Sequence, residues 1–394
     1  MNVIDINSVV DIFFKLRWNS SDAVHNEAYA ARGVNMWRDW LPENVHRLLI
    51  GKHPWEKISV EFGPGELFGK NQPPVKIDRN RFFKVPQTGR FYPKGLLRGL
   101  PGVFPQNIEP FRCISLNNGH MEVDLSHPLA NHRLNVDMTV GQLTQKETER
   151  GGSSADWLGL LTDGPGMQAR WSNTPTDFFS DNPFERTDAK ADSIFYGSPR
   201  LVHHLDQTAR EMVTDIYKRF VKADAKVLDL MSSWVSHLPE TVRFERVSGL
   251  GLNRAELEQN PQLTDIHVHD LNTNPWLPYD DTSFDLVVCT ASVEYLIHPL
   301  EVVKAVGRVL KPGGTFVVVF SNRWFPPKVI RIWEQLHEFE RIGLVMEYFL
   351  RSGAFDDVQT YSMRGLPRPR DDKYAHELQF SDPVYAVWGK RKPC

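Results

Sequence analysis

The sequence has few cysteines, no long apolar run and no strong net charge. Its cysteines, Cys113, Cys289 and Cys394, are far apart and follow no disulfide or zinc-binding spacing. We therefore expect a reducing compartment, no disulfide framework and no metal site. No apolar run approaches the roughly 20 residues of a membrane-spanning helix. The net charge of −3, without an extended basic run, argues against nucleic acid as a main partner.

What is present is typical of a soluble globular protein. Hydrophobic residues make up 41% and charged residues 24% of the 394 residues, and a chain of this length is expected to form two domains. Residues 1–11 carry acidic side chains and no cationic segment, so we expect no signal peptide and a cytoplasmic location.

Three short apolar runs predict buried strands in the second half of the chain. They lie at residues 225–230, 285–289 and 315–320. Nearly continuous apolarity is typical of strands that are covered on both faces. Residues 299–310 have apolar side chains at helical spacing, and the Lys-Pro-Gly-Gly after them ends the helix. This strand–helix–strand repetition predicts a parallel sheet that binds ligands at the carboxyl ends of its strands.

The motifs in this region carry a family resemblance. They are VLDL at 227–230, LPYDDTSFD at 277–285, LKPGG at 310–314 and the strand that follows. In this order they resemble class I S-adenosylmethionine-dependent methyltransferases, in the branch that includes quinone-biosynthesis C-methyltransferases. The resemblance implies an α/β Rossmann-like domain over residues 199–394, with a mostly parallel seven-stranded sheet. It also implies S-adenosyl-L-methionine as the cofactor.

The resemblance places the first cofactor contacts after the first strand of this domain. In the family an acid such as Asp229 helps to hold the methionine end of the cofactor. The loop after it normally carries Gly-x-Gly, but residues 231–236 contain no glycine, and Met231, Ser232 and Ser233 stand there. Serine hydroxyls and backbone N–H groups could still bind a carboxylate, whereas a bulkier loop could narrow or close the site.

Further cofactor contacts are expected after the next two strands. The family has a ribose-binding acid where this chain has Gly251, and the nearby candidates are Asn253 and Glu256. Asp270 and Leu271 are expected at the adenine ring, although an aspartate after a strand can also simply start a turn.

The loop after the fourth strand borders cofactor and acceptor in the family, and Thr290 is its first cofactor candidate. The acid–base candidates on this loop are Glu294, Tyr295 and His298. A histidine before a proline at a helix start is more often a turn residue. The acceptor-pocket candidates follow the next strand and are Asn322, Arg323 and Trp324.

Residues 1–150 predict an antiparallel, β-rich domain with little helix. Residues 57–62 and 134–140 alternate between apolar and polar side chains, and a strand is also expected at 9–17. Asn118-Gly119 between strand-like runs indicates a hairpin. A short helix is expected at 41–49.

This region carries a second resemblance. The runs ISVEF at 58–62, ELFG at 66–69, NGHMEVD at 118–124 and HPLA at 127–130 resemble SlyD-like FKBP-type peptidyl-prolyl isomerases. The resemblance implies an FKBP-like α+β domain over 1–150, with an inserted, substrate-capturing lobe near 80–130. Phe68 stands where the family has tyrosine, and Val136 where it has an aromatic residue. Because function depends on the site rather than the fold, we expect docking rather than isomerase activity.

Residues 151–198 are rich in glycine, proline and aromatic residues. Aromatic residues are scarce in disordered linkers, so this segment is expected to be a structured linker, either a covering loop or a lid over the active site. A helix over 199–220 should then lead into the first strand.

Together these features predict an S-adenosylmethionine-dependent methyltransferase acting on a small molecule, such as a thiol or a quinone-like acceptor. The FKBP-like domain would serve as a docking or substrate-binding module. Two alternatives stay open. One is a protein methyltransferase whose FKBP-like domain captures its protein substrate. The other is a folding or scaffold protein without catalytic activity.

Overall fold

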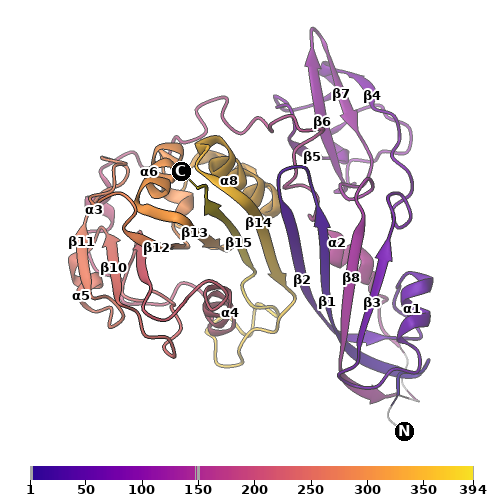
Figure 1. Ribbon diagram of the computed structural model, residues 1–394. Helices are drawn as coiled ribbons and strands as arrows, with labels where there is room; N and C mark the ends of the chain where they lie inside the picture. Colours follow the sequence, from indigo (N-terminus) through magenta and orange to yellow (C-terminus); the bar gives the residue numbers. More distant parts are fainter. Residues whose placement is uncertain (1–2, 147, 149–150, 394) are drawn as a thin grey trace. The chain divides into compact units, whose positions relative to one another are not determined.

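The computed structural model describes residues 3–146, 148 and 151–393 and divides into two compact units. The first unit comprises residues 1–180 and 363–366, and the second comprises 181–362 and 367–394. Figure 1 shows the elements of each. Residue 150, the expected end of the first domain, and Cys394 lie outside the described residues.

The first unit is built on an antiparallel sheet. Its strands are β1 (Ser8–Asn19), β2 (Val24–Asn35), β3 (Lys57–Phe62) and β8 (Leu134–Gln145), in the order β2-β1-β8-β3. This confirms the prediction of an antiparallel, β-rich region. The expected short helix is α1 (Glu43–Leu49), which Pro42 precedes.

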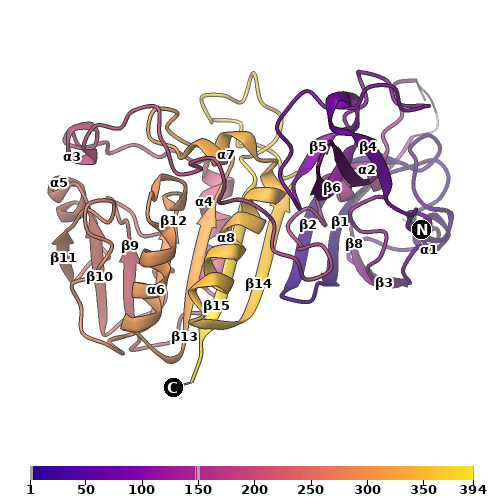
Figure 2. The same cartoon turned by 90° about the horizontal axis from the view of Figure 1, so that it is seen from above.

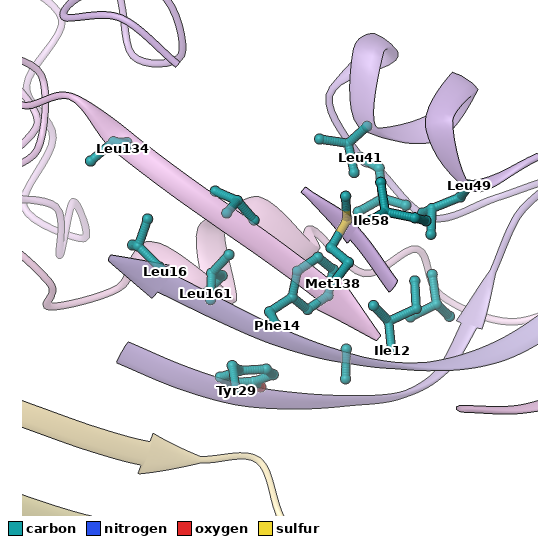
Figure 3. Packing of buried hydrophobic residues seen from close by; sticks show 14 of the residues in the cluster. Ile12, Phe14, Leu16, Tyr29, Leu41, Leu49, Ile58, Leu134, Met138 and Leu161 are labelled. Carbon is teal, nitrogen blue, oxygen red and sulfur yellow. The ribbon is translucent and has the colours of Figure 1, made fainter. Parts of the chain in front are cut away.

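The core of the first unit lies on one face of this sheet. Alternate residues of β1 are buried, as a strand with one covered face requires. Figure 3 shows Phe14 and Leu16 of β1 packing with Met138 of β8 and with Leu161 of α2 (Trp157–Thr162). Burial of these apolar side chains, at roughly 25 cal/mol per Å² of apolar area, stabilises the sheet.

A lobe with its own small core is inserted between β3 and β8. Its strands are β4 (Val75–Asp78), β5 (Phe91–Pro93), β6 (Pro110–Asn117) and β7 (His120–Asp124), in the antiparallel order β4-β7-β6-β5. Two short 3-10 helices, η1 (Arg79–Arg81) and η2 (Lys94–Leu96), lie among them. The expected hairpin is confirmed, because Asn117 pairs with His120 and Gly119 takes a φ of 80°.

The second unit contains a seven-stranded sheet in the order β11-β10-β9-β12-β13-β15-β14. Its strands are β9 (Lys226–Leu230), β10 (Arg246–Gly251), β11 (Asp265–Val268), β12 (Phe284–Thr290), β13 (Leu310–Phe320), β14 (Phe355–Arg364, the last two residues of which belong to the first unit) and β15 (Val384–Arg391). The pairs from β11 to β13 are parallel, and β15 runs antiparallel to β13. The expected mostly parallel, Rossmann-like sheet is thus confirmed.

Helices cover both faces of this sheet. Figures 1 and 2 show α6 (Pro299–Val309) and α8 (Glu338–Ser352) on one face and α4 (Gln207–Tyr217) on the other. The shorter helices are α3 (Asp192–Phe195), α5 (Arg254–Glu258), η3 (Val293–Tyr295) and α7 (Arg331–Gln335). In the part of the chain that the structure describes, we find no helix with the length and apolarity needed to cross a bilayer.

The prediction of a helix over 199–220 is wrong at its start. α4 begins only at Gln207, because the carboxylate of Asp206 accepts a hydrogen bond from the Ala209 N–H at 3.0 Å and caps the helix there. Residues 199–206 are left in an irregular conformation.

The strand order of the second unit reverses between β9 and β12. β10 and β11 follow β9 on one side, whereas β12 and β13 continue on the other. The loops after β9 and β12 therefore diverge at the carboxyl edge of the sheet and leave a crevice there, which is where doubly wound sheets bind ligands.

Candidate functional site

A cavity of about 190 Å³ lies at this carboxyl edge, within the second unit. Its walls come from the segments that follow four neighbouring parallel strands and from residues 192–210. The cofactor candidates on the walls are Met231, Ser232, Ser233, Asn253, Asp270, Leu271 and Thr290. Asp229 is not a wall residue but lies directly behind one. Their assignment to the cofactor stays a prediction.

Asp229 is a buried acid at the end of β9. The Ser232 hydroxyl donates to its carboxylate at 2.5 Å. Burial raises the pKa of Asp229 to about 7, against the opposing effect of the hydroxyl groups of Ser232 and Ser236. The serine loop is thereby tied to the strand that precedes it.

The glycine-free loop takes a tight turn after β9. Met231 has a φ of 57°, in the left-handed region that glycine normally occupies, whereas Ser232 and Ser233 are not among the positive-φ residues. The Ser232 N–H donates to the Leu250 carbonyl at 2.7 Å and holds the loop against β10. The left-handed conformation in this turn therefore falls on Met231 and on neither serine.

Glu256 links the serine loop, residues 231–236, to the covering segment, residues 192–210, which lines the cavity. One carboxylate oxygen accepts from the Ser233 hydroxyl at 2.6 Å, and the other accepts from the Arg200 backbone N–H at 2.7 Å. Asn253 caps α5 and donates to the Tyr196 carbonyl at 2.8 Å. Both ribose candidates therefore already hold the covering segment in place.

Asp270 organises the turn after β11. Its oxygens accept from the backbone N–H groups of Asn272 and Thr273 and from the Thr273 hydroxyl at 2.9, 3.3 and 2.9 Å. Leu271 beside it is buried. Thr290, at the end of β12, lies 2.6 Å from the Tyr217 hydroxyl, measured between the two oxygens.

A cationic group without a matching acid lines the cavity beside the serine loop. The Nε of Arg210 is buried without a hydrogen-bond partner, and no ion pair with a carboxylate involves it among the described residues. His237 lies nearby, and burial, with Arg210 and His203 adding to it, lowers its pKa to about 4. A buried guanidinium nitrogen without a partner is unfavourable, so this arrangement favours an anionic ligand group.

The acid–base candidates occupy three different environments. Tyr295 lines the cavity, and its hydroxyl accepts from the Phe325 N–H at 2.9 Å. Glu294 is buried and is not a wall residue. Burial raises its pKa to about 8, against the lowering effect of its own backbone N–H and of Arg341. His298 is exposed at the start of α6.

The acceptor-pocket candidates face other parts of the second unit. Arg323 donates to Asp382 at 2.9 Å, and the Trp324 ring lies 4.4 Å from the Arg341 guanidinium carbon. Asn322 is exposed. Only Phe325, the next residue, lines the cavity.

The main wall residues that sequence reasoning did not single out come from the covering segment. They are Tyr196, Arg200, His203 and His204. The signal in the sequence was the presence of aromatic residues in a loop rich in proline and glycine. A covering loop and a lid both have this composition, so it did not identify the wall residues. The structure places residues of this segment on the cavity wall. Lys328, fully buried, holds it there through ion pairs with Asp188 at 3.3 Å and Asp192 at 3.1 Å.

Metal binding has no obvious place in the described residues. Within them, no group of three or more His, Cys, Asp or Glu side chains could hold a metal ion. Cys113 and Cys289 are free and buried, and burial raises the pKa of both thiols.

Comparison with known proteins identifies the domain that carries the cavity. Residues 234–318 match the family model described as "Methyltransferase domain". A ubiquinone/menaquinone biosynthesis C-methyltransferase UbiE of Bartonella quintana is 29% identical over 161 residues, which are 40% of this chain and 53% of that protein. The mitochondrial 2-methoxy-6-polyprenyl-1,4-benzoquinol methylase of Mus musculus is 28% identical over 97 residues, 25% of this chain and 29% of that protein.

A solved complex also aligns with part of this chain. It contains a putative methyltransferase and the Trm112 methyltransferase activator of Haloferax volcanii, and the alignment covers 47% of this chain and 91% of that chain at 19% identity, with a TM-score of 0.36. The present chain spans about half or less of the length of the curated relatives named above.

The second unit thus contains a methyltransferase domain of the S-adenosylmethionine-dependent class, and its cofactor is S-adenosylmethionine. The wall residues fit this molecule. Arg210, whose Nε has no hydrogen-bond partner, suits the carboxylate of S-adenosylmethionine. The turn at Asp270, with its oxygens and backbone N–H groups, suits the adenine.

Proposed function

We propose that the protein transfers a methyl group from S-adenosylmethionine to a small-molecule acceptor. The observation that carries this proposal is the cavity at the point where the strand order reverses, lined by all but one of the cofactor candidates. The cofactor supplies an electrophilic methyl group on a sulfonium. The acceptor atom would bond to that methyl carbon as the methyl–sulfur bond breaks and its electron pair returns to sulfur, so the products would be the methylated acceptor, S-adenosylhomocysteine and a proton from the acceptor.

The residues of the chain have mainly positioning roles in this reaction. Arg210 would hold the cofactor's carboxylate, and Asp270 and Leu271 would border the adenine. Asn253 and Glu256 border the ribose. Fixing donor and acceptor in line accounts for much of the rate enhancement in such transfers.

His204 is the best-placed group to take the proton. Its ring lines the cavity and packs edge-on against Phe325 at 5.0 Å between ring centroids. Burial, and to a smaller extent Arg200, lower the pKa of His204, so the ring is neutral at pH 7 and able to accept a proton. Among the earlier candidates, Tyr295 keeps a place at the cavity wall, where its hydroxyl could orient the acceptor.

For the first unit we propose an FKBP-like docking module. Its strand pattern and inserted lobe support this assignment. The lobe exposes several large apolar side chains, namely Phe83, Val85, Phe104 and Ile108. Exposed apolar groups of this kind are typical of binding surfaces. A small molecule carried by a protein, or a protein segment, could dock there.

Calorimetric titration with S-adenosylhomocysteine tests the methyltransferase proposal. We expect a dissociation constant near the micromolar range, about −8 kcal/mol. Asp270→Ala should weaken binding tenfold or more, because it removes the carboxylate that orders the turn proposed to border the adenine. Thr273→Val is the matched control. It removes the hydroxyl that donates to Asp270 but leaves the carboxylate and its two backbone hydrogen bonds, so its affinity should stay within about twofold of the parent. Lack of binding to the parent would contradict the proposal.

A further inference from the structure

A second arginine lines the cavity without an acid partner. Arg200 is a wall residue, and no ion pair involves its guanidinium in the described part of the chain. The carboxylates on the walls are already engaged. Asp192 pairs with Arg186 and Lys328, Glu256 accepts from Ser233 and a backbone N–H, and Asp270 holds its own turn. The Arg200 charge is therefore available to a ligand.

The Arg200 guanidinium lies among three aromatic rings. Its central carbon is 4.4 Å from the Phe195 centroid, 5.2 Å from that of Phe325 and 5.5 Å from that of Tyr196. Contact with rings uses the faces of the guanidinium and leaves the N–H groups at its edge free. Among the described residues, one of these groups is used, an Nη2 hydrogen that the Phe195 carbonyl accepts at 2.9 Å. An edge of this kind matches a carboxylate in size and planarity.

The same end of the cavity offers hydroxyl groups and flat apolar surface. The Tyr196 hydroxyl is buried without a hydrogen-bond partner. The Tyr295 hydroxyl accepts from a backbone N–H and keeps its own hydrogen for another acceptor. Their rings lie 6.4 Å apart, and each lies within 6.4 Å of the Phe325 ring. A buried hydroxyl without a partner is unfavourable unless a ligand or water completes it.

Resting on the methyl transfer proposed above, we propose that the acceptor is an aromatic carboxylate. Its ring packs among Tyr196, Tyr295 and Phe325, and its carboxylate binds the free edge of Arg200. A neutral quinone-like ring would satisfy the aromatic surface but would leave the arginine without a counterion. The charge of Arg200 therefore distinguishes the two acceptor classes.

The test compares matched acids and amides on protein saturated with S-adenosylhomocysteine. The probes are benzoate against benzamide and indole-3-carboxylate against indole-3-carboxamide, titrated by calorimetry. Each pair shares its ring and differs in charge. We expect at least one acid to bind tenfold or more tightly than its amide. Arg200→Met keeps an apolar stem and should abolish this preference, whereas Arg200→Lys should retain part of it.

Arg243→Met is the control for the loss of one positive charge. The Arg243 side chain is 90% exposed and is not one of the wall residues, so the acid preference should be unchanged. Equal binding of acids and amides to the parent, or binding of neither, would overturn the proposal. So would loss of S-adenosylhomocysteine binding in Arg200→Met, because the arginine would then serve the cofactor.

Binding of S-adenosylhomocysteine and preference for acids over amides test different claims. If the parent does not bind S-adenosylhomocysteine, the methyltransferase function itself is wrong. If that molecule binds normally but the acid preference is absent, only the acceptor class is wrong.

Discussion

The cofactor loop shows how single residues replace a missing glycine motif. Gly251 explains one departure from the family pattern, since a Cβ at this position would lie 2.2 Å from the Ser232 carbonyl oxygen. Any side chain there would collide with the Ser232 backbone, so the serine loop would have to move. Met231 explains the other, because it accepts the left-handed conformation that glycine would adopt without strain.

Met231→Gly should therefore stabilise the protein. Relief of the left-handed strain outweighs the added freedom of the unfolded chain, and we expect the free energy of unfolding to rise by about 1 kcal/mol.

Ser232→Gly and Ser233→Gly should weaken the binding of the cofactor. They remove hydroxyls that bind Asp229 and Glu256, and we expect them to lose roughly 0.5–1.5 kcal/mol of cofactor binding. Urea denaturation and titration with S-adenosylhomocysteine check the two effects. Tighter binding in the serine variants would show that the loop is impaired.

Arg210→Met should weaken the binding of S-adenosylhomocysteine about tenfold, which is roughly 1.4 kcal/mol. The expected cause is loss of the charge that faces the ligand's carboxylate. Methylthioadenosine lacks that carboxylate, so its affinity should not change in the same variant. Arg243→Met serves as the control for net charge. Equal weakening of both ligands would mean that Arg210 supports the cavity wall rather than the carboxylate.

At the scale of elements, the sequence predicts best where one periodicity holds throughout. The apolar runs were sufficient to predict β9, β12 and β13, and the spacing of apolar residues was sufficient to predict α6, since each element is buried in a simple pattern. β2 was not predicted, because its buried positions include the polar residues His25 and Glu27, so apolar and polar side chains do not alternate along it. The covering segment escaped because its place over the cavity depends on distant partners such as Lys328 and Glu256.

Burying a carboxylate at the end of a central strand should make stability depend on pH. The pKa of Asp229 is about 7 in the folded protein and near 3.8 when exposed, so the folded state holds the proton between these values. The stability that this group contributes is present below pH 3.8 and is lost as the pH rises toward 7, by up to about 4 kcal/mol.

Asp229→Asn should remove that part of the pH dependence. The amide keeps an oxygen for the Ser232 hydroxyl but cannot ionise. Chemical denaturation at pH 5 and pH 8 should show a smaller difference in unfolding free energy for the variant than for the parent. Asp215→Asn removes an acid from the surface as a control. The same pH dependence in Asp229→Asn and the parent would contradict the burial argument.

At the scale of the whole molecule, the chain combines two units with separate cores. The described residues divide between 180 and 181, inside the segment that the sequence predicts to be a linker over 151–198. The boundary could not be predicted more closely, because this segment contributes to both units. Leu161 packs into the first core, and Tyr196 lines the cavity of the second. Its aromatic residues indicate packing but not the partner.

The first unit should lack isomerase activity in the intact protein. Phe68 has no hydroxyl to donate to a bound carbonyl, and its ring is already stacked on His127, at 3.7 Å between centroids and 4° between planes. Val136, buried in β8, offers no aromatic wall. A proline ring would have to displace the histidine before it could bind. Catalysis of proline-limited refolding by the full chain should therefore stay near the uncatalysed rate, with a SlyD-like isomerase as the positive control.

Phe68→Tyr alone should not restore isomerase activity, because His127 still covers the ring, whereas Phe68→Tyr combined with His127→Ala should raise it. Turnover by the unmodified chain comparable to the positive control would show that the pocket is open, and the docking proposal for this unit would then have to include catalysis.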